Sequence, residues 1–443
     1  MQLFMQLFMQ FNLILLLLFC TSAVASDLRI EVTQGLDKPV RIAVVPFERK
    51  GWGRLPEKVS DVVDSDLQLS GRFVTTPVEG MLSRPHRSKE VLYRDWRLLK
   101  VEYLVIGSLM IRGNEIRVEY ELHNVFEQSR EISETVVADR NELRDLGHHI
   151  SDRVFEKLTG ISGAFSTRIM YVTALGSIED RTYRLNIADS DGFRVETVLE
   201  TSEPILSPSW APDGSRIAYV SFEKDSKPAI YLHDLSKKTR RIITNFQGLN
   251  GAPSFSPDGQ KLALVLSKSG NPDIWTYDLN TRRMAQITRH YGIDTEPSWF
   301  PDGRSLIFTS NRGGSPQIYK VDLHDLKIQR LTFEGDYNAG ASLLADGSAL
   351  VMVHRRNDVY HISLLDLHRG RLSVLTQTSL DESPSIAPNG SMLIYATEDN
   401  GQGILAAVSI DGGVRFKLPS TEGEVREPAW SPRKRTTINS ILD

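Results

Sequence analysis

The sequence of 443 residues contains a single cysteine, Cys20. Phe19, directly before it, does not fit a lipid-attachment signal, and Cys20 falls within the targeting segment described next. The mature chain is therefore expected to hold no disulfide, no thiol nucleophile and no cysteine-based metal site. Its stability must come from the burial of apolar surface.

Long apolar runs are also scarce. The stretch at residues 13–19 is too short to span a bilayer, and the small residues Ala23-Val24-Ala25 that follow are typical of a signal-peptidase site. We therefore predict a cleaved signal peptide at residues 1–25, a mature chain that starts near Ser26, and no transmembrane segment. The Lys or Arg that usually opens a signal peptide is missing from residues 1–12.

A basic surface and the usual catalytic motifs are missing as well. The net charge is −4, with both signs interspersed along the chain, so nothing indicates a nucleic-acid partner. There is no Gly-x-Ser-x-Gly elbow, no glycine-rich phosphate loop and no His-Glu-x-x-His sequence. We interpret the pair His148-His149, in a predicted helix, as a solvated edge rather than a metal site. The sequence therefore favours a binding protein over an enzyme.

What the sequence does contain is a repeat of a Pro-Ser-aromatic segment followed by a Pro-Asp-Gly joint. The joint recurs every 43 to 45 residues, and its copies end at Gly214, Gly259, Gly303, Gly347 and Gly390. Proline, aspartate and glycine in this order favour a tight turn. Three short runs rich in β-branched and aromatic residues follow each joint, so each unit holds four strands. Four strands at this period predict the blades of a β-propeller.

The number of blades follows from the two ends of the repeat. Residues 168–172 match a second strand, and the first unit has no first strand of its own. A spare copy of the first strand lies at residues 428–432. We predict that it completes the first blade, with Trp430 beside Met170, and closes a six-bladed ring over residues 166–443.

The residues before the propeller, 26–160, do not share the repeat and read as a small α/β domain, joined to it by a linker at residues 161–165. The domain has a buried strand at 41–47 and three more strands at 103–110, 115–122 and 130–137. Its helices are predicted at 56–69, 92–99 and 141–158. The alternating segment at 27–37 has two interpretations, an edge strand of this domain or a mobile arm that docks and undocks.

Polar residues gather in the loops that connect the fourth strand of one blade to the first strand of the next. These loops meet at one mouth of the central channel. Their polar residues are Asn250, Asp294, Thr295, Glu296, Asn338, Asp381, Glu382, Glu424 and Arg426. A mostly acidic mouth suits a protein segment that bears Lys or Arg, or a Ca²⁺ ion in the channel. The alternative is that each of these residues only solvates its loop.

Several segments together resemble the TolB family of the Tol-Pal system. The resemblance covers essentially the whole mature chain, and the segments that carry it are residues 41–47, 250–259, 295–302, 317–321, 380–390 and 428–432. It implies an N-terminal α/β domain followed by a six-bladed propeller, no catalysis and no cofactor. A secreted propeller enzyme or a glycan-binding module is the alternative.

The resemblance also implies a location and partners. It implies a periplasmic protein, a monomer outside its complexes, that supports outer-membrane constriction during cell division and envelope integrity. Family members bind the lipoprotein Pal at the propeller mouth, and some colicins use the same mouth. Carried over by motif, the Pal-facing positions include Leu249, Asn250, Ala252 and Thr295, and Leu249 stands where relatives often have a polar residue.

A second partner of the family, TolA, is reached through the N-terminal part. In this chain that part corresponds to an arm formed by Asp27, Leu28, Arg29, Ile30, Glu31 and Val32. Residues 433–443, after the closing strand, make a longer tail than the family usually shows.

Overall fold

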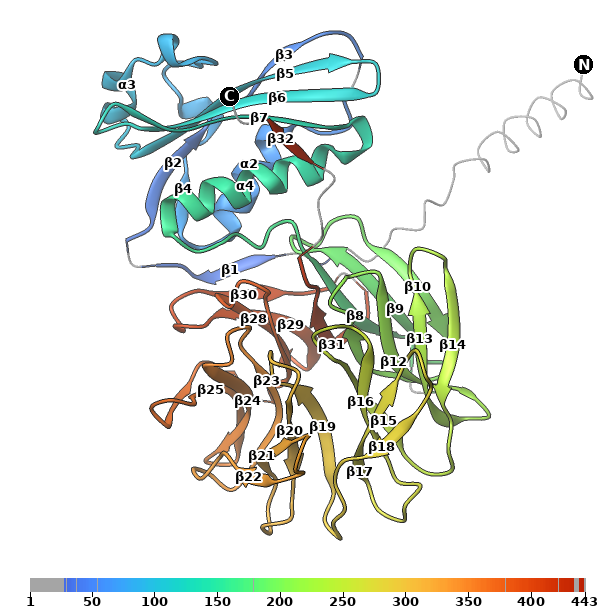
Figure 1. Cartoon of the computed structure of the whole chain (residues 1–443). Helices are drawn as coiled ribbons and strands as arrows, with labels where there is room; N and C mark the ends of the chain where they lie inside the picture. The colour runs from blue at the N-terminus through green and yellow to red at the C-terminus, as the bar shows by residue number, and fades with distance from the viewer. Residues whose placement is uncertain are drawn as a thin grey trace, which may run out of the picture.

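The computed structural model describes residues 28, 30–36, 38–53, 55–177, 179–378, 380–420, 422–433 and 438–441. A small α/β domain sits on one face of a ring of six β-sheets (Figure 1). The predicted signal peptide, along with Asp27 and Arg29 of the arm, lies outside the described residues. No helix in the described part of the chain is long and apolar enough to cross a membrane.

The N-terminal domain is one twisted sheet with helices on both faces. Its strands follow the order β32-β7-β6-β5-β2-β4, and β3 pairs with the far half of β5. The strand bounds are β2 Val40–Val44, β3 Glu48–Lys50, β4 Phe73–Thr75, β5 Tyr103–Arg112, β6 Glu115–Asn124, β7 Ser129–Asp139 and β32 Asn439–Ile441. The helix bounds are α2 Val59–Leu69, α3 Tyr93–Leu98 and α4 Leu143–Thr159, with 3₁₀ turns η1 Val78–Gly80, η2 Ser88–Glu90 and η3 Arg140–Glu142.

Helices α2 and α4 cover one face of this sheet because each carries an apolar stripe at helical spacing. Val63 and Leu67 of α2 and Ile150 and Val154 of α4 are all buried in one core with the sheet. Helix α4 ends at Thr159 and is capped by Gly160, whose φ of 71° is the left-handed conformation that glycine adopts most readily. The side of these two helices that points away from the sheet faces the propeller (Figure 1).

The propeller has six blades, as the repeat predicts. Blade 1 combines β31 Glu424–Trp430 with β8 Arg168–Leu175, β9 Thr182–Asp189 and β10 Glu196–Thr201. Blades 2 and 3 are β11 Ile205–Trp210, β12 Arg216–Lys224, β13 Lys227–Asp234, β14 Thr239–Thr244, then β15 Asn250–Phe255, β16 Lys261–Leu266, β17 Asp273–Asp278 and β18 Met284–Gln286. Blades 4 and 5 are β19 Asp294–Trp299, β20 Ser305–Ser310, β21 Gln317–Asp322, β22 Ile328–Arg330, then β23 Asn338–Leu343, β24 Ala349–Arg356, β25 Val359–Asp366 and β26 Arg371–Val374. Blade 6 holds β27 Glu382–Ile386, β28 Met392–Asp399, β29 Gln402–Ser409 and β30 Arg415–Leu418.

The repeated residues build turns and join blades. In blade 3 the carboxylate of Asp258 accepts the backbone N–H of Gln260 at 3.0 Å, and Gly259 has a φ of 67°, which confirms that the aspartate forms the turn. The repeated tryptophan links neighbouring blades, since the indole N–H of Trp299 donates to the carbonyl of Ser254 at 3.1 Å. Local chemistry thus explains why each copy of the motif looks alike.

The ring closes as predicted. Strand β31 pairs antiparallel with β8, which places Ala429 opposite Met170 and Trp430 opposite Ile169. The indole N–H of Trp430 also donates to the hydroxyl of Thr167 at 2.8 Å. The last strand of the propeller and its first strand in sequence therefore form one blade.

Each end of the chain adds a strand to the domain at the other end of the sequence, which the sequence did not predict. Strand β1 (Glu31–Gln34) adds a fifth strand to blade 6 by pairing with β30, so its interpretation as an edge strand of the small domain is wrong. Strand β32 pairs with β7 of the small domain, although the sequence assigned residues 166–443 to the propeller. Figure 1 shows both, the blue β1 beside the propeller and the dark red β32 beside the N-terminal sheet.

The small domain covers the propeller face that carries the Asp-Gly turns. The side chain of Asn389, in the blade 6 turn, donates to the carbonyl of Ser162 at 2.8 Å. Arg72, after α2, lies 3.8 Å from Asp411 in the turn between β29 and β30. Because successive strands alternate in direction, the loops between blades open on the opposite face. The predicted binding mouth therefore faces away from the small domain.

Candidate functional site

The first strand of every blade lines a central channel with a cavity of about 490 Å³. Each of these strands holds one extra residue relative to its neighbour, which forms a β-bulge. The bulged residues share a positive φ and are Ser207, Ala252, Glu296, Gly340, Ser383 and Glu427. Five of the six precede a proline. The channel wall thus carries six equivalent positions, and only two of them bear a charge.

Those two charged positions, Glu296 and Glu427, lie three blades apart and so on opposite sides of the ring. The carboxylate of Glu296 accepts the backbone N–H of Gly340 in the next blade at 2.8 Å. Glu427 accepts the N–H of Ser207, again in the next blade, at 3.0 Å. Burial, together with the nearby charges of Glu382 and Glu296, raises the pKa of Glu427 to about 7. Each glutamate therefore joins two blades and places a carboxyl group in the wall of the channel.

Four of the predicted mouth residues are buried and bonded within the protein. They stand three positions before the proline, or its equivalent, in blades 3 to 6 and are Asn250, Asp294, Asn338 and Asp381. Side chains at this position fix the conformation of the loops. Because they are buried, they can affect a partner only through that conformation.

Two examples show how tightly this position is held. The amide oxygen of Asn250 accepts the N–H of Phe246 at 3.0 Å, and its amide group donates back to the carbonyl of Phe246 at 2.7 Å. The carboxylate of Asp294 pairs with the guanidinium of Arg312 at 2.7 Å. Moving a buried side chain away from these partners would break its hydrogen bonds and cost free energy.

The other predicted residues line the channel or the rim, where a partner can reach them. They are Leu249, Ala252, Thr295, Glu296, Glu382, Glu424 and Arg426, all exposed or half-buried. Arg426 donates to the carboxylate of Glu424 at 2.5 Å. Its positive charge is thus partly matched within the mouth.

Sequence reasoning missed the apolar part of this mouth. Six further large apolar side chains stand exposed on or beside the same loops, at Leu206, Phe246, Tyr291, Ile293, Phe333 and Leu380. Tyr291 is 85 % exposed and Phe333 is 75 % exposed. The available signal was the presence of aromatic residues in loops that are otherwise polar. Exposed apolar residues grouped in this way are typical of a protein-binding surface.

The mouth therefore combines an apolar rim with carboxylates deeper in the channel. This combination suits a polypeptide that carries apolar and basic side chains. Among the described residues, the group of three side chains close enough together to hold a metal ion is Asp66, His148 and Asp191, at the domain interface. Ca²⁺ in the channel remains a prediction.

The docked arm is the second candidate site. Leu28 is buried and forms an isolated antiparallel β-bridge with Ser420. Ile30 is half-buried against an apolar cavity of about 100 Å³ between the two domains. The side chains of β1 itself are exposed, and the backbone pairs Glu31 with Lys417 and Val32 with Phe416. Few buried side chains hold this segment, so it can be displaced more easily than a core strand.

Comparisons with known proteins agree with this architecture. A family model described as the TolB amino-terminal domain matches residues 28–131, and one described as the TolB beta propeller domain matches residues 155–434. The chain is 58 % identical over 428 residues to the Tol-Pal system protein TolB of Alcanivorax borkumensis, covering 96 % of this chain and 98 % of that protein. It is 60 % identical over 419 residues to the protein of the same name from a Marinomonas species, covering 94 % and 96 %. The crystal structure of TolB from Acinetobacter baumannii superposes with a TM-score of 0.84 at 43 % identity, covering 91 % of this chain and 99 % of that one. The chain belongs to the TolB family.

Proposed function

We propose that this protein is the periplasmic adaptor of a Tol-Pal system. It binds the lipoprotein Pal at the propeller mouth and TolA through the N-terminal arm, and so supports outer-membrane invagination in cell division and envelope integrity. Membership of the TolB family confirms that the chain is not an enzyme. Export through the signal peptide at residues 1–25 belongs to the proposal, and N-terminal sequencing of the protein from the periplasm should start near Ser26.

The observation that carries the Pal proposal is the apolar rim on the face opposite the small domain. Exposed aromatic side chains there can be buried by a partner, whereas the bonded residues below them keep the loops preformed. A rigid surface with aromatic anchors is the usual source of binding energy at protein interfaces.

Replacing Tyr291 or Phe333 by aspartate tests this proposal. Each change puts a charge where the partner would bury an aromatic ring, and we expect at least a tenfold loss of affinity for purified Pal in calorimetric titration, about 1.4 kcal/mol or more. Phe126, 56 % exposed on the small domain, gives the matched control, because Phe126→Asp should leave the affinity unchanged. If Tyr291→Asp and Phe333→Asp bind Pal as tightly as the wild type and Phe126→Asp do, Pal binds elsewhere on the protein.

The arm proposal rests on the shallow docking of β1. An arm held mainly through its backbone can exchange between a docked state and a free state, and Pal or TolA shifts that balance only by binding one state better. We propose that the free arm is the form that TolA binds.

A reversible cross-link tests the arm. Glu31 and Lys417 lie directly opposite each other in antiparallel strands, a separation that a disulfide can bridge, and the predicted mature chain has no other cysteine. We expect the oxidised Glu31→Cys, Lys417→Cys variant to lose TolA binding and to keep Pal binding to within a fewfold, with reduction restoring TolA. Unchanged affinity for TolA in the oxidised form would refute the proposal. Each single cysteine variant is the control.

A further inference from the structure

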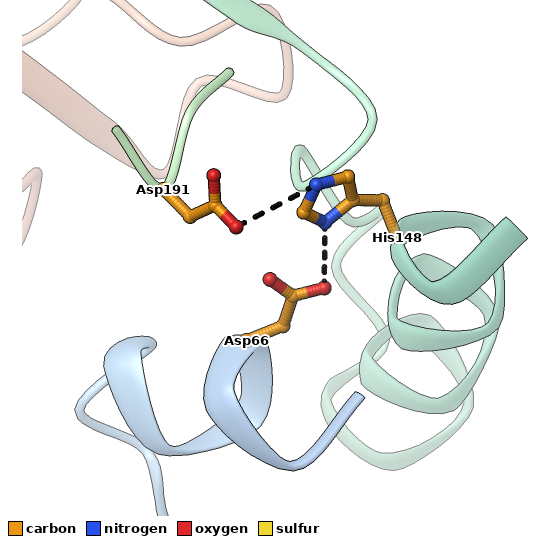
Figure 2. A group of neighbouring side chains, drawn as sticks. All are labelled: Asp66, His148 and Asp191. Carbon is orange, nitrogen blue, oxygen red and sulfur yellow. Dashed lines mark hydrogen bonds and ion pairs between the residues drawn. The ribbon is translucent and has the colours of Figure 1, made fainter. Parts of the chain in front are cut away.

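The interface between the two domains contains a buried group of charged side chains (Figure 2). His148 comes from α4 and Asp66 from α2 of the small domain, whereas Asp189 ends β9 and Asp191 follows in the turn of blade 1. His148 is 1 % exposed, so its interpretation as part of a solvated helix edge is wrong.

The histidine ring has a close contact on one side and only longer ion pairs on the other. Its Nδ1 lies 2.8 Å from the Oδ2 of Asp66. Its Nε2 forms no hydrogen bond and is buried, yet it lies 3.6 Å from the Oδ2 of Asp191 and 3.9 Å from the Oδ2 of Asp189. Figure 2 shows the ring between the two carboxylates of Asp66 and Asp191. The two oxygens that face this buried nitrogen lie at ion-pair distance. Each also accepts a hydrogen bond from a guanidinium group, the Oδ2 of Asp191 from Arg144 and the Oδ2 of Asp189 from Arg194, so a ligand here would share oxygens with these two arginines.

These separations match those between the ligands of a metal ion. Nitrogen and oxygen atoms that bind one ion at about 2.1 Å lie roughly 3–4 Å apart. A histidine that binds a metal through one nitrogen commonly donates its other N–H to a carboxylate, which fixes the orientation of the ring. Asp66 occupies that supporting place.

The surroundings of the histidine carry an excess of negative charge, and a cavity beside them gives an ion access to the site. Arg144 contacts Asp191 and Glu57, and Arg194 contacts Asp189 and Asp145. With Asp66, and with Glu196 and Arg168 from the lining of the adjacent cavity, six carboxylates lie near three guanidinium groups. A cavity of about 210 Å³ reaches His148 and Asp189 beside these groups, which leaves room for water ligands and for the entry of an ion.

We propose that His148, Asp189 and Asp191 bind a divalent transition-metal ion with the ligand preferences of Zn²⁺, and that Asp66 positions His148. One imidazole and two carboxylates form a donor set that zinc and its neighbours accept. Because the ligands come from both domains, the ion would fasten the small domain to the propeller.

A proton is the competing occupant. Burial of the ring favours the neutral form, but the charges of Asp66 and Asp191 and contact with Asp189 prevail and raise the pKa of His148 well above its ordinary value. An imidazolium at His148 would offset part of the negative charge without any metal. The experiment must therefore separate a bound ion from a bound proton.

Titration of the untagged mature protein with Zn²⁺, after removal of metals with a chelator, tests the proposal. We expect one ion per chain at micromolar concentration or below and a rise in the melting temperature. His148→Gln should abolish this binding, and Asp66→Asn should weaken it 10- to 100-fold. His149→Gln changes the neighbouring histidine, which lies outside the cluster, and should leave the affinity unchanged.

Cadmium-113 NMR of the wild-type protein provides a measurement that does not depend on how the variants fold. One resonance in the range of mixed nitrogen and oxygen ligands, removed by an equivalent of Zn²⁺, would support the site. No saturable binding by the intact protein, or equal binding by His148→Gln, would overturn the proposal. So would nitrogen-15 spectra that show a doubly protonated His148 in the presence of excess Zn²⁺.

Discussion

At the scale of single residues, Glu427 makes the stability of the protein depend on pH. Its pKa is about 7 in the folded protein against an ordinary value of 4.5. Between these two values the folded state binds more protons at Glu427 than the unfolded state does, so the contribution of this group to stability falls as pH rises through the window and is smallest above pH 7. Each unit of pKa shift corresponds to about 1.4 kcal/mol, and the solvent in the channel reduces the effect.

Replacing Glu427 by glutamine should remove this dependence. Glutamine keeps an oxygen that can accept the N–H of Ser207 but carries no charge, so the variant should melt a few degrees above the wild type at pH 8 and close to it at pH 4.5. Glu200→Gln, on an exposed outer strand, is the control and should show the wild-type profile. A glutamine variant that loses stability equally at both pH values would mean that the carboxylate acts only through its hydrogen bond. The measurement is calorimetric melting from pH 4 to pH 9.

Single residues also show what sequence could predict about the site. The spacing of the repeat located the mouth. Most of the polar residues predicted in its loops lie instead in the first strands of the blades, as Asn250, Asp294 and Glu424 do. Asn250 and Glu382 were both predicted in the mouth, yet one is buried and bonded to its own loop and the other is exposed. Asn250 stands three residues before a proline and Glu382 two residues before one, so neighbouring positions in the same strand point to opposite sides.

At the scale of elements, the blades were predictable because their signals are local. A Pro-Asp-Gly joint forms a turn wherever the flanking strands pair, and the same chemistry recurs in each copy. The partner of an isolated strand is not encoded in this way. The alternation in β1 predicts a strand with two different faces, but it does not say which sheet edge the strand will join. The docking of β1 on blade 6 and of β32 on β7 therefore became visible only in three dimensions.

At the scale of the whole molecule, the exchanged ends join the domains from both sides. The N-terminal arm reaches the propeller, and the tail returns from the closing strand to the small domain, where Ile438 is buried in the core shared with α2 and α4. Strand β32 also covers the edge of β7, which would otherwise offer unpaired backbone groups. The tail thus belongs to the stability of the small domain rather than to that of the propeller.

Deleting residues 434–443 tests this view of the tail. The deletion leaves β31 and the closure of the ring intact but removes Ile438 from its core and uncovers β7, so the small domain should lose about 2–4 kcal/mol, the usual effect of removing a large buried aliphatic side chain. We expect faster hydrogen exchange in residues 129–139 and a lower melting temperature for the small domain, with unchanged protection in the blades. Ile438→Ala in the full chain should give most of the stability loss without exposing the edge. If the deletion instead loosened β8 and β31, the tail would serve the closure of the ring, and its pairing with β7 would be incidental.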